Sequence, residues 1–191
     1  MNIIHPSARI ADGVELGSNN IIGENVVIGG FKGEDYYHIE IGNHNIIHDN
    51  VRIMTDVFCL GDGNIFHNHI SIMAGSVIIG DNCWVAQYAL LDGMGSLHIH
   101  DDVAIGYNCY VWSHVNRPGG VPEGCLLIDI MKPTRLMSGV WLMGCNVVVN
   151  PGVTMAENSV ALPNSVVTKD TKFGKVYGGI PAIELDAEVW E

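Results

Sequence analysis

The sequence is short of positive charge and has no long apolar run. It holds nine Lys and Arg against 21 Asp and Glu, which gives a formal net charge of -12 at pH 7. Because phosphate backbones are held by clustered cations, we expect no nucleic-acid partner. Because no uninterrupted apolar stretch reaches about 18 residues, we also expect no membrane insertion.

We also expect neither a secretory leader nor a paired cysteine motif. The first residues, MNIIHPSARIADG, contain no basic flank followed by an apolar core, so a cytoplasmic location is expected. The five cysteines are odd in number and include no CxxC pair, so neither a disulfide framework nor a zinc knuckle is expected. We interpret Cys83 and Cys109 as small apolar fillers of a core.

The clearest repeat lies between residues 143 and 170. Apolar anchors recur there every six positions, and a small residue follows each of the first four anchors by four positions. The anchors are Met143, Val149, Met155, Ala161 and Val167, and the small residues are Val147, Val153, Ser159 and Ser165. A helix repeats its apolar positions at about 3.6 residues and an amphipathic strand at about 2. A period of six predicts instead short strands joined by tight corners, the hexapeptide class of parallel β-helix.

The same spacing covers most of the chain. Between residues 41 and 111 the anchors come in sets of three whose first members lie 19, 19 and 20 residues apart, so one coil has three sides. Neighbouring rungs are then expected about 4.8 Å apart. These earlier anchors are Ile4, Ile10, Leu16, Ile22, Ile28, Ile41, Ile47, Ile53, Leu60, Phe66, Ile72, Ile79, Val85, Leu91, Ile99, Ile105 and Val111.

Two segments break the repeat and are predicted to be loop insertions. Residues 30–40 are polar and aromatic, and residues 117–134 hold three of the seven prolines, which remove donors from a ladder. We therefore predict an all-β domain over residues 1–171 with loop insertions at 30–40 and 117–134. The tail, residues 172–191, is expected to turn at 178–181 and then to form one short helix that closes the open end of the prism.

Four stretches make the chain resemble the hexapeptide-repeat acyltransferases, closest to the sugar and polysaccharide O-acetyltransferases. They are IGDNCW at 79–84, VWSHVN at 111–116, VNPGVTMAENSV at 149–160, and SVVTKD at 165–170 with YGGIPA at 177–182. The resemblance implies a left-handed parallel β-helix and acetyl-CoA as co-substrate, with no metal expected. It also implies a homotrimer with active sites between neighbouring prisms, and a small-molecule sugar or glycan acceptor.

Acetyl transfer from a thioester to a hydroxyl needs a group that takes the hydroxyl proton, and histidine is suited to this near neutral pH. We predict His114 as this base, because it follows an anchor and immediately precedes the longer insertion. His69 is the alternative. The family places its histidine in the slot held here by Asn116, and Asp92, one coil earlier, is the candidate that orients His114.

The resemblance also implies a set of residues that bind coenzyme A. Trp141 matches the tryptophan that lines the acetyl and pantetheine slot of the family, and Lys169 can meet a phosphate as a point charge. The expected set is Trp141, Gly144, Cys145, Pro163, Thr168, Lys169, Gly179, Pro181 and Ala182.

The sequence leaves alternatives to O-acetylation of a sugar open. The nearest is N-acetylation of a nucleotide-linked amino sugar. A zinc enzyme of the γ-type carbonic anhydrase class shares the prism but uses a histidine spacing that is absent here. A catalytically silent scaffold would bind no coenzyme A.

Overall fold

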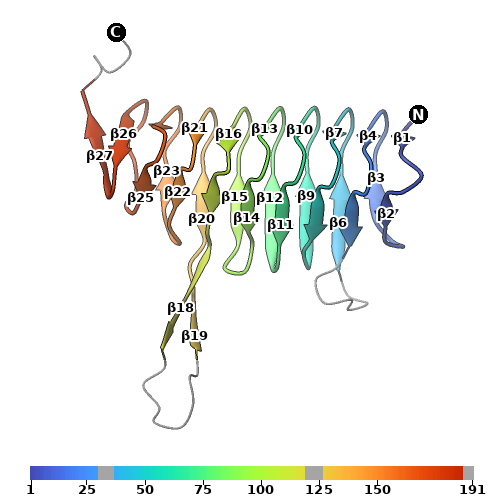
Figure 1. Ribbon diagram of the computed structural model, residues 1–191, viewed down its shortest axis with the longest axis horizontal. Helices are drawn as coiled ribbons and strands as arrows, with labels where there is room; N and C mark the ends of the chain where they lie inside the picture. The colour runs from blue at the N-terminus through green and yellow to red at the C-terminus, as the bar shows by residue number, and fades with distance from the viewer. Residues whose placement is uncertain (30–36, 119–126, 187–191) are drawn as a thin grey trace.

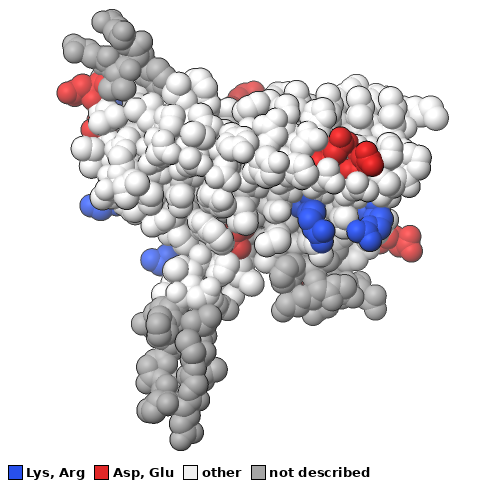
Figure 2. All heavy atoms as spheres, viewed as in Figure 1, with Lys and Arg blue, Asp and Glu red and all other residues white. Residues whose placement is uncertain are grey.

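The computed structural model describes residues 1–29, 37–118 and 127–186. The chain winds as a parallel β-solenoid, with rungs stacked along one axis between the two chain ends (Figure 1). Strands of successive coils pair in parallel and form three long sheets. The predicted all-β solenoid is therefore confirmed, and its left hand stays a prediction. On the face seen in Figure 2, charged side chains are few and most of the surface is uncharged.

We call the three long sheets A, B and C, in the order in which each coil visits them. Sheet A consists of β1 (Ile3–Ile4), β4 (Ile21–Ile22), β7 (Ile46–Ile47), β10 (Ile65–Phe66), β13 (Trp84–Val85), β16 (Ala104–Tyr107), β21 (Trp141–Cys145), β24 (Val160–Ala161), β26 (Val176–Gly179) and β27 (Ala182–Leu185). Sheet B consists of β2 (Arg9–Ile10), β5 (Val27–Gly29), β8 (Arg52–Met54), β11 (Ser71–Met73), β14 (Leu90–Asp92), β17 (Tyr110–Val111), β22 (Val148–Val149) and β25 (Val166–Val167). Sheet C consists of β3 (Glu15–Leu16), β6 (His38–Ile41), β9 (Val57–Leu60), β12 (Ser76–Ile79), β15 (Leu97–Ile99), β20 (Thr134–Leu136) and β23 (Thr154–Met155).

The predicted anchors fill the interior of the prism. From Ile22 to Val111 every anchor is buried, because a rung covers it on each side. Ile4, in the first rung, is 43% exposed, since that rung has a neighbour on one side only. One anchor is wrong: Leu142 points inward in register with Ile105, and Met143 is only partly buried. The extra residue of this rung is absorbed by a register shift between β16 and β21.

The turn from sheet C to the next sheet A strand, the CA corner, holds a buried ladder of side-chain amides. The side-chain oxygen of Asn20 accepts a hydrogen bond from the backbone N–H of Asn45 at 2.8 Å. The side-chain oxygen of Asn45 likewise accepts from the backbone N–H of Asn64 at 2.8 Å. Asn64 in turn accepts from the N–H of Cys83 at 2.8 Å. Burial raises the pKa of the Cys83 thiol, and that of Cys109, to about 11, and both cysteines are confirmed as core fillers.

The second predicted insertion contains regular structure. β18 (His114–Pro118) and β19 (Leu127–Met131) pair antiparallel and project from the body of the solenoid (Figure 1). The prediction of a loop over 117–134 is therefore wrong where these strands lie, because prolines are compatible with the end of a two-stranded ladder that offers its outer edges to solvent. Residues 119–126 lie outside the described residues.

The first predicted insertion is shorter than expected. β6 begins at His38, and its residues alternate between exposed and buried, so the prediction of a loop over 38–40 is wrong. The residues of this strand include charged side chains because they face outward at every second position. The remainder of this insertion, residues 30–36, lies outside the described residues.

The predicted C-terminal helix is also wrong where it can be compared. β26 pairs in parallel with β24, and β27 folds back antiparallel on β26, so the tail extends sheet A. An open sheet edge offers unpaired backbone groups, and a hairpin satisfies them more directly than a helix does. Residues 187–191 lie outside the described residues. The described part of the chain has no helix, and hence none that is long and apolar enough to cross a bilayer.

Candidate active site

The candidate site lies at the turn between sheets B and C, which we call the BC corner. β14 and β17 are neighbours in sheet B, with Leu90 opposite Tyr110 and Leu91 opposite Val111. This register brings the last residue of β14, Asp92, against the residues that follow β17. Asp92 therefore meets Ser113 and His114 of the next coil, as the sequence predicted for Asp92 and His114.

Asp92 is a buried carboxylate that several donors hold in place. The residue as a whole is 4% exposed. Oδ2 accepts hydrogen bonds from the backbone N–H of Ser113 at 2.9 Å and of His114 at 3.1 Å, and the Ser113 hydroxyl oxygen lies 3.0 Å from it. A carboxylate with this many donors on one oxygen has little freedom to rotate, so it is a rigid acceptor for the histidine ring.

The imidazole of His114 is oriented by this carboxylate. Its Nδ1 lies 2.8 Å from Asp92 Oδ2, while the side chain keeps 18% of its surface exposed. The acceptor-only carboxylate selects the tautomer with the proton on Nδ1, so Nε2 carries the free lone pair. The edge of the ring also contacts Trp112, with ring centroids 6.1 Å apart. A partly exposed imidazole held by a buried carboxylate is suited to act as a general base.

Two residues that the sequence analysis missed complete this corner. The Ser113 hydroxyl donates to the backbone oxygen of Asp92 at 2.7 Å and accepts from the N–H of Gly95 at 2.8 Å. A Cβ at position 95 would collide with the backbone oxygen of Ser113, so only glycine fits there. The signal was present in the sequence, since Gly95 and Ser113 are small residues beside the two candidates in successive coils.

The other two catalytic candidates lie elsewhere. His69 sits at the turn between sheets A and B, the AB corner, where it is exposed and stacks on Tyr88 with ring centroids 5.0 Å apart. Its backbone is in the left-handed region, with φ at 63°. Asn116 lies on β18, opposite Asp129 of β19. The structure thus unites His114 with Asp92 and places His69 at a different corner.

The residues expected to bind coenzyme A fall into two groups. Trp141 is 42% exposed on the outer face of sheet A, and Gly144 and Cys145 end the same strand, β21. Pro163 of the next coil covers Gly144, whose φ is 70°, and a Cβ on that glycine would lie 2.7 Å from the proline ring. Gly144, Cys145 and Pro163 therefore lie at the AB corner, and Trp141 lies at the other end of β21.

The second group lines a cavity of about 300 Å³ at the C-terminal end of the solenoid. Thr168 and Lys169 lie on one side, and Pro181 and Ala182 of the β26–β27 hairpin on the other. Gly179 anchors the hairpin, because its N–H donates to the Ser165 hydroxyl at 3.2 Å.

The same cavity is also lined by residues that the sequence analysis did not select, among them Lys172 and Glu184. These two form an ion pair at 2.8 Å, which links the segment before β26 to β27. His114 lines neither this cavity nor the larger hollow of about 510 Å³ on sheet C. Cavity volume alone therefore does not find the histidine, and the chemistry of the side chains identifies the BC corner as the candidate site.

Comparison with known proteins gives one local sequence match and many matches of fold. No family model matches the chain. A segment of 49 residues is 45% identical to the galactoside O-acetyltransferase of Escherichia coli K12, which is 26% of this chain and 24% of that protein. The match thus spans about a quarter of the length of that relative.

Two solved structures share the fold over most of their length. One is a mutant of AntD, an N-acyltransferase from Bacillus cereus in complex with dTDP and coenzyme A, with a TM-score of 0.62 at 19% identity over 92% of this chain and 84% of that one. The other is NeuO, a polySia-specific acetyltransferase, with a TM-score of 0.61 at 21% identity over 95% of this chain and 80% of that one. At sequence identities of 19% and 21%, these two similarities show a shared fold and nothing beyond it.

Proposed function

We propose that the chain is an acetyl-CoA-dependent O-acetyltransferase of the hexapeptide-repeat acyltransferase superfamily, and its repeat, its fold and the local sequence match support this proposal. Its acceptor is the hydroxyl of a sugar or glycan precursor. The observation that carries this proposal is the His114–Asp92 pair, in which a buried carboxylate holds a partly exposed imidazole. This pair is the arrangement that proton transfer from a hydroxyl needs.

In this mechanism His114 moves one proton in each direction. Nε2 takes the proton of the acceptor hydroxyl while the hydroxyl oxygen forms its bond to the thioester carbonyl carbon. As the carbon–sulfur bond breaks, Nε2 returns that proton to the departing sulfur, so no covalent enzyme intermediate is required. Asp92 acts as a positioning residue, because it keeps Nδ1 protonated and the ring turned outward.

The residues at the C-terminal cavity and those around β21 can both contribute to the binding of acetyl-CoA. Acetyl-CoA, when bound, would supply the activated acetyl thioester. The cavity between Thr168 and the β26–β27 hairpin is open to a chain of ligand atoms, and the exposed ammonium of Lys169 beside it suits a phosphate. Trp141, Gly144 and Cys145 offer an apolar side chain and a close backbone approach along sheet A.

The trimer that the resemblance implies is supported by the outer face of sheet A. Successive strands place one apolar side chain after another on that face, in register along the whole solenoid. They are Ile3, Ile21, Ile46, Ile65, Trp84, Ala104, Trp141 and Val160. A continuous apolar face of this length is typical of a subunit contact.

The direct test is an assay of coenzyme A release with acetyl-CoA and a panel of sugars. Each acceptor is offered as a matched pair, one member with a hydroxyl and the other with an amine at the same carbon. We expect release with the hydroxyl sugars and an increase in product mass that corresponds to one acetyl ester. Release with the amines alone would assign N-acetylation instead, and the absence of coenzyme A binding would leave a scaffold.

A further inference from the structure

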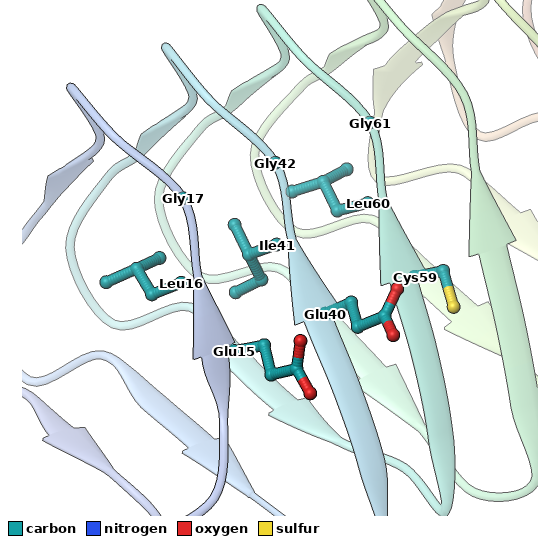
Figure 3. Close-up of a pocket in the computed structure, with 9 residues that line it drawn as sticks. All are labelled: Glu15, Leu16, Gly17, Glu40, Ile41, Gly42, Cys59, Leu60 and Gly61. Carbon is teal, nitrogen blue, oxygen red and sulfur yellow. The ribbon is translucent and has the colours of Figure 1, made fainter.

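The outer face of sheet C carries a cluster of side chains that acetyl transfer does not use. His38 and Glu40 point outward from β6, two residues apart, and Cys59 points outward from the neighbouring strand β9. Glu40 lies opposite Cys59 in the ladder, and Glu15 of β3 lies opposite Glu40 on the other side. Figure 3 shows the side chains of Glu15, Glu40 and Cys59 on this one face.

The distances within the cluster are short enough for a common metal ion. One ligand atom each of His38, Glu40 and Cys59 lies within 4.8 Å of the other two. His38 Nε2 is already 2.9 Å from Glu40 Oε1. Donors around a tetrahedral zinc ion lie about 3.4 Å apart, given bonds of about 2.0–2.3 Å. His38 and Glu40 are exposed, so small side-chain rotations suffice to close the remaining gap.

The types of donor atom point to zinc rather than to a hard cation. Thiolate, imidazole and carboxylate are the three side-chain groups that bind Zn²⁺ in proteins. Magnesium and calcium prefer sets made of oxygen alone, so the sulfur of Cys59 disfavours them. A hollow of about 510 Å³, lined by Glu15, Glu40 and Cys59, leaves space for a fourth ligand (Figure 3).

The electrostatics of the cluster also favour a bound cation. Glu15 and Glu40 are like charges directly opposite each other in adjacent strands, which destabilises a sheet. Among the residues that the structure describes, Glu40 forms an ion pair with His38. Burial, and then the charge of Glu40, raise the pKa of the Cys59 thiol. A divalent ion would offset the repulsion and stabilise the thiolate.

We propose that His38, Glu40 and Cys59 form a binding site for Zn²⁺, with the fourth position open to a solvent molecule in the hollow that Glu15 also lines. When the ion binds, the Cys59 thiol releases its proton to solvent and the sulfur–zinc bond forms. The ion links β6 to β9, which belong to successive coils, and therefore stabilises the N-terminal half of the solenoid. The site is separate from the BC corner of Asp92 and His114 and does not depend on the proposed acetyl transfer.

The experiment uses Co²⁺ as a spectroscopic substitute and Zn²⁺ as the competitor. The full-length reduced protein, freed of metal with a chelator, is titrated with Co²⁺ while thiolate-to-cobalt charge-transfer absorption is recorded. Zn²⁺ is then added to displace the cobalt, and the melting temperature is measured with and without Zn²⁺. The variants are Cys59→Ser, His38→Ala and Glu15→Gln, and His44→Ala is the control, since His44 is an exposed histidine outside the cluster.

We expect one equivalent of Zn²⁺ to abolish the charge-transfer band and to raise the melting temperature of the wild type. Cys59→Ser should remove the band, and His38→Ala should weaken zinc binding at least about tenfold, whereas Glu15→Gln should weaken it by less. His44→Ala should behave as the wild type. A wild type without the band, or equal zinc binding by Cys59→Ser and wild type when both are folded by circular dichroism, would overturn the proposal.

Discussion

Two histidines occupy the same position relative to their anchors and yet have different surroundings. His114 follows Val111 by three residues, and His69 follows Phe66 by three residues. At the BC corner, the preceding coil presents the buried carboxylate of Asp92 to His114 at 2.8 Å. At the AB corner, the following coil presents the ring of Tyr88 to His69.

The difference teaches that in a solenoid a side chain takes its chemistry from the adjacent coil. A carboxylate partner selects one tautomer and one ring orientation, whereas an aromatic partner provides a stacking contact and no such selection. The coil around Asp92 is also one residue longer than the two before it, and Gly93, Met94 and Gly95 provide that corner with its wider turn.

The largest expected effect comes from removing each histidine in turn, which tests whether His114 and His69 differ in catalysis. His114→Ala should lower kcat by at least about 100-fold, because a positioned acid-base group contributes about that much or more. His69→Ala should change kcat by less than about threefold, since His69 has no carboxylate partner among the described contacts. Steady-state kinetics with acetyl-CoA and the acceptor measure both.

His69→Ala also serves as the matched control for the loss of an imidazole from a corner. An unchanged kcat in a folded His114→Ala protein would remove His114 from the mechanism. A large loss in His69→Ala alone would move the active site to the AB corner.

A smaller effect is expected when the partner is changed and the histidine is kept. Asp92→Asn should lower kcat by about 10-fold or more with little change in the KM for acetyl-CoA, because the ring is no longer held in one tautomer. The measurement is the separation of kcat from KM at a fixed acceptor concentration, together with the melting temperature. If kcat falls only in proportion to the folded fraction, Asp92 is structural rather than positioning.

The smallest effect concerns an exposed aspartate that contrasts with buried Asp92. Asp62, at the CA corner, accepts from the backbone N–H of Asn43 at 2.6 Å, and this bond holds the pKa of its carboxyl below the ordinary 3.8. A lowered pKa contributes stability above about pH 4, which is lost as the pH falls through the folded-state value.

Asp62→Asn should therefore make the melting temperature less sensitive to pH below about pH 4 and leave catalysis unchanged. Thermal unfolding of variant and wild type at a series of acidic pH values gives the comparison. Parallel curves for the two proteins would show that the hydrogen bond to Asn43 does not contribute.

The sequence allowed Asp92 and His114 to be predicted as neighbours, because the coil length defines which residues share a corner. It did not reveal that Asp92 is buried, nor that Ser113 and Gly95 complete its surroundings, since hydrogen bonds between coils depend on the exact path of each turn. The metal-binding cluster was not predicted either. Its three ligands come from two strands, and only the register of β6 on β9 brings them together.

The six-residue period by itself determined that this chain is a three-sided all-β solenoid with its anchors inside. This followed because each rung buries its apolar residue against identical rungs, so local spacing and global packing agree. The segments without that period were decided by tertiary structure. β18 with β19 formed a hairpin and the tail joined sheet A, where backbone donors and acceptors found partners that no local pattern specifies.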